Sequence, residues 1–251
     1  MREDCFPLKP CGGCDYAMKT DVTITDERMV LTCTGVTKTY RTRGKQISVL
    51  RGIDLAIPKG TLTVITGNSG TGKTTLLSIA GGLDRPDTGR IAFMGNPMES
   101  LTARESALLR RGRIGFIFQN FNLIDSWTAI ENAEAGLIHL RVTADEKRRL
   151  ATDLLAGLGL AGRLDSFPDE LSVGEEQRVA IARTLAARPS LVLADEPTGS
   201  VDDETGAEII RRLMAHTREH GGSVIVATHG PFPLGTADAV FRLAEGVLLP
   251  L

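Results

Sequence analysis

A glycine-rich stretch with one lysine is the part of this sequence best suited to chemistry. It reads Gly67, Asn68, Ser69, Gly70, Thr71, Gly72, Lys73, Thr74 and Thr75, after the β-branched run 61–66 and before the apolar run 76–80. Between a strand and a helix, such a loop aims backbone N–H groups and the positive end of the helix dipole at one point. We predict a nucleotide site in which Lys73 reaches the β- and γ-phosphates and the Thr74 hydroxyl binds Mg²⁺.

Two carboxylates close a second apolar run, 191–194, which we expect to be a buried strand. Asp195 and Glu196 would then lie at the carboxyl end of a parallel strand, where such sheets bind ligands. Asp195 is suited to hold Mg²⁺, often through water, and Glu196 is suited to accept a proton from an attacking water. His229 ends the run 223–228 in the matching position.

Two further motifs each have a structural alternative. Leu171, Ser172, Val173 and Gly174 open an amphipathic stretch and form a second potential anion site, although Ser172 could simply cap a helix. Tyr40 stands just before the basic, polar loop 41–46. It either covers the core as a strand-end aromatic or offers a stacking platform for a base.

The composition limits the kinds of partner. The 251 residues carry a net charge of −2, which argues against nucleic acid as a main partner. Since the sequence has no apolar run long enough for a bilayer and no secretory signal pattern, we expect a cytosolic chain with free thiols. Cys5, Cys11 and Cys14 fall in a tail that contains Pro and Gly, where incidental thiols are favoured over a zinc site, and Cys33 suits a core strand.

The remaining patterns arrange these motifs along an α/β chain. We expect antiparallel β structure over 29–57, strands at 61–66, 90–94, 114–118, 191–196 and 223–228, and a hairpin at 239–249. Helical spacing covers 73–82, 101–111, 128–140, 143–158 and 204–219, with a capping box of Thr143 and Glu146. The domain division is a flexible extension at 1–28 and one nucleotide-binding domain at 29–251, with a largely helical subdomain at about 97–188.

Taken in order, these elements resemble the nucleotide-binding subunit of an ATP-binding cassette (ABC) transporter. The resemblance covers 29–251 and rests on the glycine loop, Gln119, residues 171–174, residues 191–196, Ser200, Val201, Asp202 and His229. Within the family, residues 81–84, 130–132 and 193–199 are similar to the branch of lipoprotein-release and macrolide-export ATPases. The implied fold is α/β: a P-loop NTPase (RecA-like) core with an antiparallel β subdomain and an inserted α-helical subdomain.

The resemblance also implies roles for individual residues. Tyr40 would stack on adenine, Gln119 would contact Mg²⁺ or the attacking water, and His229 would touch the γ-phosphate of ATP. Residues 171–174 would close over ATP bound to a second chain, so that a homodimer or heterodimer shares two nucleotides. An integral membrane permease would dock beside Gln119, holding the chain on the inner face of the cell membrane. The apolar contacts offered there are Phe121, Leu123, Ile124 and Trp127.

Three positions depart from the family pattern. Val173 replaces a glycine, Glu176 replaces a basic or neutral residue, and Gly230 replaces an aspartate. A β-branched residue adds bulk beside the partner's phosphate and disfavours positive φ. This favours an alternative, a weakly hydrolysing nucleotide-gated subunit paired with another ATPase chain. A cassette protein of DNA repair or translation fits poorly with the near-zero charge, and a small-molecule P-loop kinase would leave residues 171–178 without a purpose.

Overall fold

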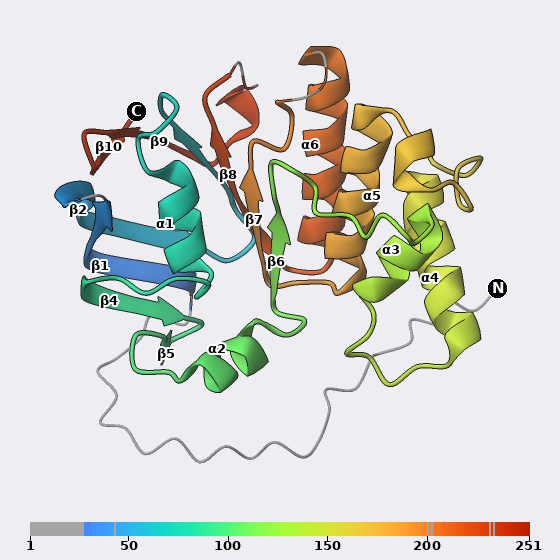
Figure 1. The fold of residues 1–251 in the computed structure, drawn as a ribbon, viewed down its shortest axis with the longest axis horizontal. Helices are drawn as coiled ribbons and strands as arrows, with labels where there is room; N and C mark the ends of the chain where they lie inside the picture. The colour runs from blue at the N-terminus through green and yellow to red at the C-terminus, as the bar shows by residue number, and fades with distance from the viewer. Residues whose placement is uncertain (1–27, 43, 200, 202, 231, 233) are drawn as a thin grey trace.

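The computed structural model describes residues 28–251 except 43, 200, 202, 231 and 233 (Figure 1). Cys5, Cys11 and Cys14 therefore lie outside the described residues, as do Ser200 and Asp202. The predicted extension at 1–28 is likewise outside this range apart from its last residue.

Four described strands form an antiparallel sheet in the order β2-β1-β4-β5. They are β1 (Met29–Thr42), β2 (Lys45–Pro58), β4 (Thr88–Phe93) and β5 (Asn96–Pro97). Alternate residues Ile53, Leu55 and Ile57 of β2 are buried, which is the period expected of a sheet with one covered face. This sheet corresponds to the antiparallel structure predicted over 29–57, extended by β4 and β5.

Six described strands form the central sheet, in the order β10-β9-β3-β8-β7-β6. They are β3 (Leu62–Thr66), β6 (Ile114–Ile117), β7 (Leu191–Asp195), β8 (Ser223–Thr228), β9 (Ala239–Ala244) and β10 (Val247–Pro250). All adjacent pairs run parallel except β9 and β10, which form the predicted closing hairpin. Every residue of β7 and β8 is buried, as expected for central strands of a sheet covered on both faces.

The carboxyl ends of β3, β8 and β7 lie side by side, because β8 pairs with both of the others. The glycine loop follows β3, Glu196 follows Asp195 of β7, and His229 follows β8. The topology therefore brings the glycine loop together with two segments that lie more than a hundred residues further along the sequence.

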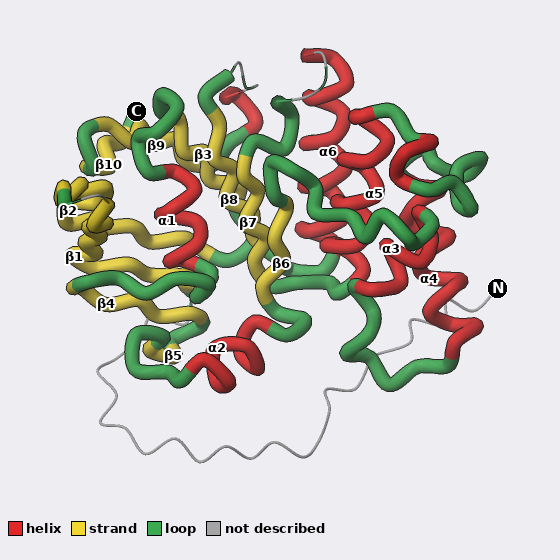
Figure 2. The backbone as a smooth tube through the Cα atoms, in the orientation of Figure 1, coloured by secondary structure: helices red, strands yellow, loops and turns green. Residues whose placement is uncertain are grey.

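The described helices lie on opposite faces of the central sheet (Figures 1 and 2). They are α1 (Lys73–Ala80), α2 (Ala103–Arg110), α3 (Ala129–Ala135), α4 (Ala144–Gly157), α5 (Val173–Ala186) and α6 (Asp203–Glu219), with short 3-10 turns at Pro168–Glu170 and Leu234–Thr236. Helices α3, α4 and α5 pack on one another, away from the antiparallel sheet. The predicted helical segment 97–188 also contains β6, which pairs with β7 in the central sheet.

Two apolar cores cover opposite faces of the central sheet. Val192 and Ala194 of β7 join the core beneath α3–α6, whereas Leu191 and Leu193 join the core that surrounds α1 and contacts the antiparallel sheet. Successive side chains of a strand point to opposite faces, so one five-residue strand anchors both cores. Cys33 is buried in the second core, as predicted.

Candidate nucleotide site

The glycine loop needs glycine where its backbone passes close to neighbouring strands. Gly72 caps α1 with a φ of 104°, a left-handed conformation that favours glycine, and a Cβ there would lie 2.7 Å from Val49 Cγ1. A Cβ on Gly67 would lie 2.6 Å from the carbonyl oxygen of Leu243 on β9. The loop is thus held tightly between β2 and β9.

The first N–H groups of α1 have no side-chain cap. Gly72 makes no capping hydrogen bond by a side chain, and the first turn of α1 contains no acidic residue. In contrast, α2, α3, α4 and α5 each begin with a capping box, formed by Thr102 with Glu105, Thr128 with Glu131, Thr143 with Glu146, and Ser172 with Glu175. The uncovered N–H groups and positive dipole end of α1 suit a phosphate group.

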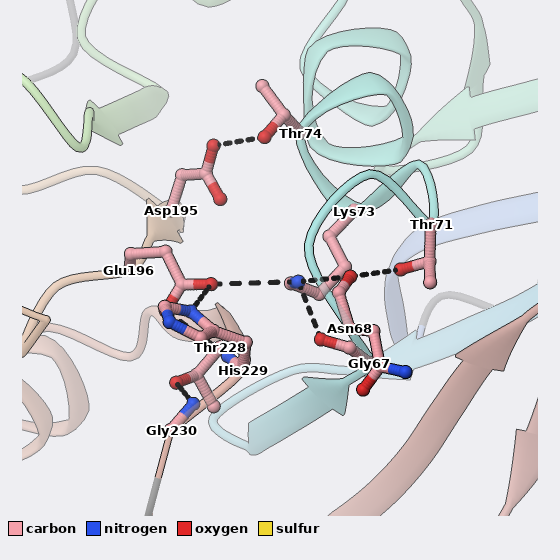
Figure 3. A network of polar contacts seen from close by, with 10 residues as sticks. All are labelled: Gly67, Asn68, Thr71, Lys73, Thr74, Asp195, Glu196, Thr228, His229 and Gly230. Carbon is pink, nitrogen blue, oxygen red and sulfur yellow. Dashed lines mark hydrogen bonds and ion pairs between the residues drawn. The ribbon is translucent and has the colours of Figure 1, made fainter.

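Lys73 lies inside the glycine loop and is only 7% exposed. Its ammonium group donates hydrogen bonds to the carbonyl oxygens of Gly67 at 2.7 Å and Asn68 at 3.2 Å. The same Nζ lies 3.6 Å from Glu196 Oε1, so the loop and the end of β7 meet through this cation (Figure 3).

Thr74 and Asp195 form a second contact between the same elements. The Thr74 hydroxyl donates to Asp195 Oδ2 at 2.6 Å (Figure 3). Burial raises the pKa of Asp195, the Glu196 charge adds to this rise, and the Thr74 hydrogen bond and Lys73 oppose it. A carboxylate beside a hydroxyl provides the oxygen donors that Mg²⁺ prefers, so the residues fit the predicted metal.

Glu196 has an unusual backbone conformation at the end of β7. Its φ is 51°, and its N–H donates to the carbonyl oxygen of Ala227 at 2.8 Å. Its Oε1 lies 2.7 Å from His229 Nδ1, and the His229 backbone N–H donates to Oε2 at 3.2 Å. A left-handed non-glycine residue is strained, and such strain persists where surrounding bonds hold it, often at functional sites. The carboxylate is thereby held between Lys73 and His229.

Other predicted site residues lie outside this network. Gln119 is exposed two residues beyond the end of β6, and Tyr40 is 38% exposed near the end of β1. The stacking of Tyr40 on a base and the metal contact of Gln119 remain predictions.

The predicted anion motif stands at the start of α5. The backbone N–H of Glu175 donates to the Ser172 hydroxyl at 3.3 Å, so Ser172 does cap the helix. Val173 is the first helical residue, is 51% exposed, and is not among the residues with positive φ. Because a helix start has negative φ, the preference of a β-branched residue against positive φ has no cost in this conformation. The exposed Val173 side chain still adds bulk at the start of α5.

Arg183 was not singled out from the sequence, yet it organises the segment after Gln119. Its guanidinium donates to the carbonyl oxygens of Asn122 and Phe121, each at 2.6 Å. Phe121 and Asn122 both have positive φ, 57° and 50°. The helix that begins with the anion motif therefore also fixes the strained turn beyond Gln119. Sequence periodicity gave no signal for this, since Arg183 reads as an ordinary helical residue.

A buried asparagine holds the next part of the same segment. Asn132 of α3 is fully buried, and its side-chain oxygen accepts from the Ile124 N–H at 2.8 Å. Its amide group donates to the carbonyl oxygens of Ile124, Trp127 and Thr128. Ile124 and Trp127 each remain 38% exposed, whereas Leu123 packs against the core. Of the predicted docking residues, Ile124 and Trp127 are thus exposed on a loop that Asn132 holds by hydrogen bonds.

The sequence is similar to those of known proteins. A family model described as "ABC transporter" matches residues 50–199. The chain is 43% identical to the lipoprotein-releasing system ATP-binding protein LolD 1 of Chlorobium luteolum, over 88% of this chain and 96% of that protein. It is 42% identical to the macrolide export ATP-binding/permease protein MacB of Syntrophobacter fumaroxidans, over 86% of this chain. The chain spans about a third of the length of the MacB relatives, 30% and 32%.

Solved structures show the same likeness. The cassette MJ0796, solved as a dimer in a post-hydrolysis state bound to ADP and Pi, has a TM-score of 0.81 at 36% identity, covering 87% of this chain and 96% of its own. CbiO1 of Clostridium perfringens, described as part of the ABC transporter complex cbiONQ, has a TM-score of 0.77 at 28% identity, over 88% of this chain and 87% of its own. These matches confirm the predicted fold class. Among the described residues, no helix has both the length and the apolar character needed to cross a membrane.

Proposed function

Because this chain belongs to the ABC transporter family, we propose that it is the ATP-binding and ATP-hydrolysing subunit that powers transport through a separate permease. One observation carries the proposal: Lys73 of the uncapped glycine loop lies 3.6 Å from Glu196, which follows β7. A phosphate held by the loop would therefore face a carboxylate able to accept a proton from water.

The proposal includes the predicted domain division, with a nucleotide-binding domain at 29–251 and a helical subdomain whose packed helices are α3, α4 and α5.

The residues divide the work of phosphoryl transfer. The N–H groups of Asn68, Ser69, Gly70, Thr71, Gly72, Thr74 and Thr75 would bind phosphate oxygens, and Lys73 would exchange its bonds to the loop carbonyls for bonds to the β- and γ-phosphates. The Thr74 hydroxyl and Asp195, with Gln119, would hold Mg²⁺, which when bound neutralises phosphate charge. Glu196 would accept the proton of the attacking water, and His229 would keep the Glu196 carboxylate oriented and reach toward the γ-phosphate.

The proposal includes a partner for each side of the chain. Leu171, Ser172, Val173 and Gly174 would meet the nucleotide of a second ATPase chain, as the dimeric state of MJ0796 supports. A permease helix would contact Ile124 and Trp127, which are exposed on the loop held by Arg183 and Asn132. The names of LolD and MacB, a lipoprotein-releasing system and a macrolide exporter, support a membrane transport role, which we place at the cytoplasmic face of the cell membrane.

Val173 supports the alternative of a weakly hydrolysing subunit. Its side chain is 51% exposed at the first helical position of α5, where a partner's phosphate would approach the helix end. Such a chain would close on ATP but would rely on a different ATPase chain for most of the turnover.

The test combines dimerisation with phosphate release, for the purified chain and a Glu196→Gln variant. With MgATP, we expect the variant to form stable dimers by light scattering and the parent to release phosphate at least about a hundredfold faster than the variant. A slow parent that gains activity when mixed with a second ATPase chain would favour the weakly hydrolysing alternative. A parent that neither binds ATP nor releases phosphate would overturn the proposal.

A further inference from the structure

The exposed ring of Tyr40 is tied to the far end of the phosphate-loop helix. Its hydroxyl donates to Asp84 Oδ2 at 2.8 Å, and Asp84 stands four residues beyond the end of α1. Burial and the Asp84 hydrogen bond raise the pKa of Tyr40, while a hydrogen bond with Thr75 of α1 acts in the opposite direction. The ring of β1 and the helix that begins at Lys73 therefore share polar contacts.

Lys38 completes the tether from the same face of β1. Its Nζ lies 2.9 Å from Asp84 Oδ1 and donates to the carbonyl oxygen of Arg85 at 2.6 Å. The same Nζ lies over the Tyr40 ring, 5.1 Å from its centroid. Burial acts to raise the pKa of Asp84, but the hydrogen bonds from Lys38, Tyr40 and the Arg85 N–H outweigh it and hold that pKa below its usual value. Both carboxylate oxygens of Asp84 thus accept hydrogen bonds.

The turn that carries Asp84 is fixed independently of the ring. The Thr39 N–H donates to Asp87 Oδ2 at 2.7 Å, and the Asp87 N–H donates to the carbonyl oxygen of Thr37 at 2.9 Å. The hydroxyls of Thr37 and Thr88 lie 2.8 Å apart. Asp84 is therefore presented by a turn already bonded to the main chain of β1.

A cavity joins the cross-strand neighbour of Tyr40 to the glycine loop. Ile47 of β2 is the cross-strand partner of Tyr40 and is 52% exposed. A cavity of about 460 Å³ extends from Ile47 to Asn68, Ser69, Gly70 and Thr71 of the glycine loop. A nucleotide whose base stacks on Tyr40 would run past Ile47 toward the glycine loop.

We propose that Asp84 and Lys38 are positioning residues that hold the Tyr40 ring as the base platform at a set distance from the phosphate loop. The inference rests on the proposed function, since it assumes that Tyr40 stacks on the base. An exposed aromatic ring loses rotational freedom on binding, and a ring already held in its binding orientation loses less. With Lys38 over one face, the base stacks on the other face.

The experiment separates base binding from phosphate binding with two probes, MgATP and inorganic tripolyphosphate. Tyr40→Phe keeps the ring but removes its tether, and Asp84→Asn weakens the tether from the other end. We expect each variant to bind ATP about 3- to 10-fold more weakly, the loss typical of one hydrogen bond. The KM for ATP rises by the same factor, whereas kcat and tripolyphosphate affinity stay within about twofold of the parent. The double variant loses little more than either single variant, because both remove one interaction.

Matched controls distinguish the tether from general loosening of the turn. Asp87→Asn disturbs the same turn without touching the ring and should leave ATP affinity within about twofold of the parent. Lys38→Met in the Asp84→Asn background leaves no unpaired carboxylate and should cause little further loss. The proposed tether would be overturned if Tyr40→Phe and Asp84→Asn both bind ATP as tightly as the parent. It would also be overturned if the variants weaken ATP binding and tripolyphosphate binding equally. A parent chain that binds no ATP would instead overturn the proposed function.

Discussion

The Thr74 hydroxyl donates a 2.6 Å hydrogen bond to Asp195, joining the first turn of α1 to the end of β7. Asp195 is only 8% exposed, and burial raises its pKa. A carboxylate whose folded-state pKa is raised costs stability above that pKa, because the unfolded chain ionises more readily. At neutral pH the ionised Asp195 therefore lowers the stability of the fold. This is the cost expected where a residue serves function rather than folding.

Asp195→Asn should stabilise the chain while it abolishes turnover. The amide carries no charge to desolvate and is a poor Mg²⁺ ligand, so we expect a gain of about 0.5–2 kcal/mol in unfolding free energy at pH 7 without Mg²⁺. The gain should shrink as pH falls through the raised pKa of Asp195, where the parent carboxyl becomes neutral too. Urea unfolding measures this, with exposed Asp153→Asn on α4 as the control. A variant less stable than the parent at pH 7 would contradict the prediction.

Shortening Val173 should speed hydrolysis by the homodimer. The side chain stands exposed in the first turn of α5, so its removal opens the face that, in the proposed dimer, would meet the partner's phosphate. We expect kcat to rise about threefold in Val173→Gly, which corresponds to a barrier lower by about 0.7 kcal/mol, and to rise less in Val173→Ala. Glycine in the first turn should cost at most about 1 kcal/mol of stability. Parental kcat in both variants would indicate that the bulk of Val173 does not limit closure.

The capping carboxylate of α5 should make stability depend on acid pH. Hydrogen bonds from the Ser172 N–H and hydroxyl, aided by Arg163, lower the pKa of Glu175 from 4.5 to about 2. Because this pKa is depressed in the folded state, Glu175 stabilises the chain above pH 4.5, and the contribution disappears as pH falls toward 2. Glu175→Gln keeps the capping geometry without the charge.

Urea unfolding of this pair should show the parent more stable than Glu175→Gln by about 0.3–1 kcal/mol at pH 6, the usual value of an acidic group at a helix start. The difference should diminish steadily between pH 4.5 and the lowest pH at which both proteins remain folded. A difference that stays constant over this interval would mean that the charge of Glu175 contributes nothing to α5.

Replacing Arg183 by lysine should loosen the turn beyond Gln119. Lysine cannot donate to two carbonyl oxygens in the fork geometry of arginine, so one of the Phe121 and Asn122 contacts is lost. We expect unfolding free energy to fall by about 1–3 kcal/mol and kcat to fall at saturating ATP, with KM near the parental value. Exposed Arg149→Lys on α4 is the matched control. Parental kcat together with lowered stability would limit Arg183 to a structural role.

The sequence alone was sufficient to predict those elements whose local chemistry requires particular residue types. The glycine loop, the apolar strand before Asp195 and the capping box of Thr143 with Glu146 were all recognisable, because phosphate binding, burial and capping each demand particular residues at fixed spacing. The order of these motifs also identified the family, which the comparisons confirm. The roles of Tyr40 and Gln119 remain predictions.

Tertiary structure alone decided which distant groups meet. Pairing of β8 with both β3 and β7 places Lys73, Glu196 and His229 together, and no local pattern specifies that strand order. The guanidinium of Arg183 finds carbonyls some sixty residues away because α5 packs beside the segment after β6. Periodicity reports which face of an element is buried, whereas a long polar side chain takes its partner from whatever the packed fold brings within reach.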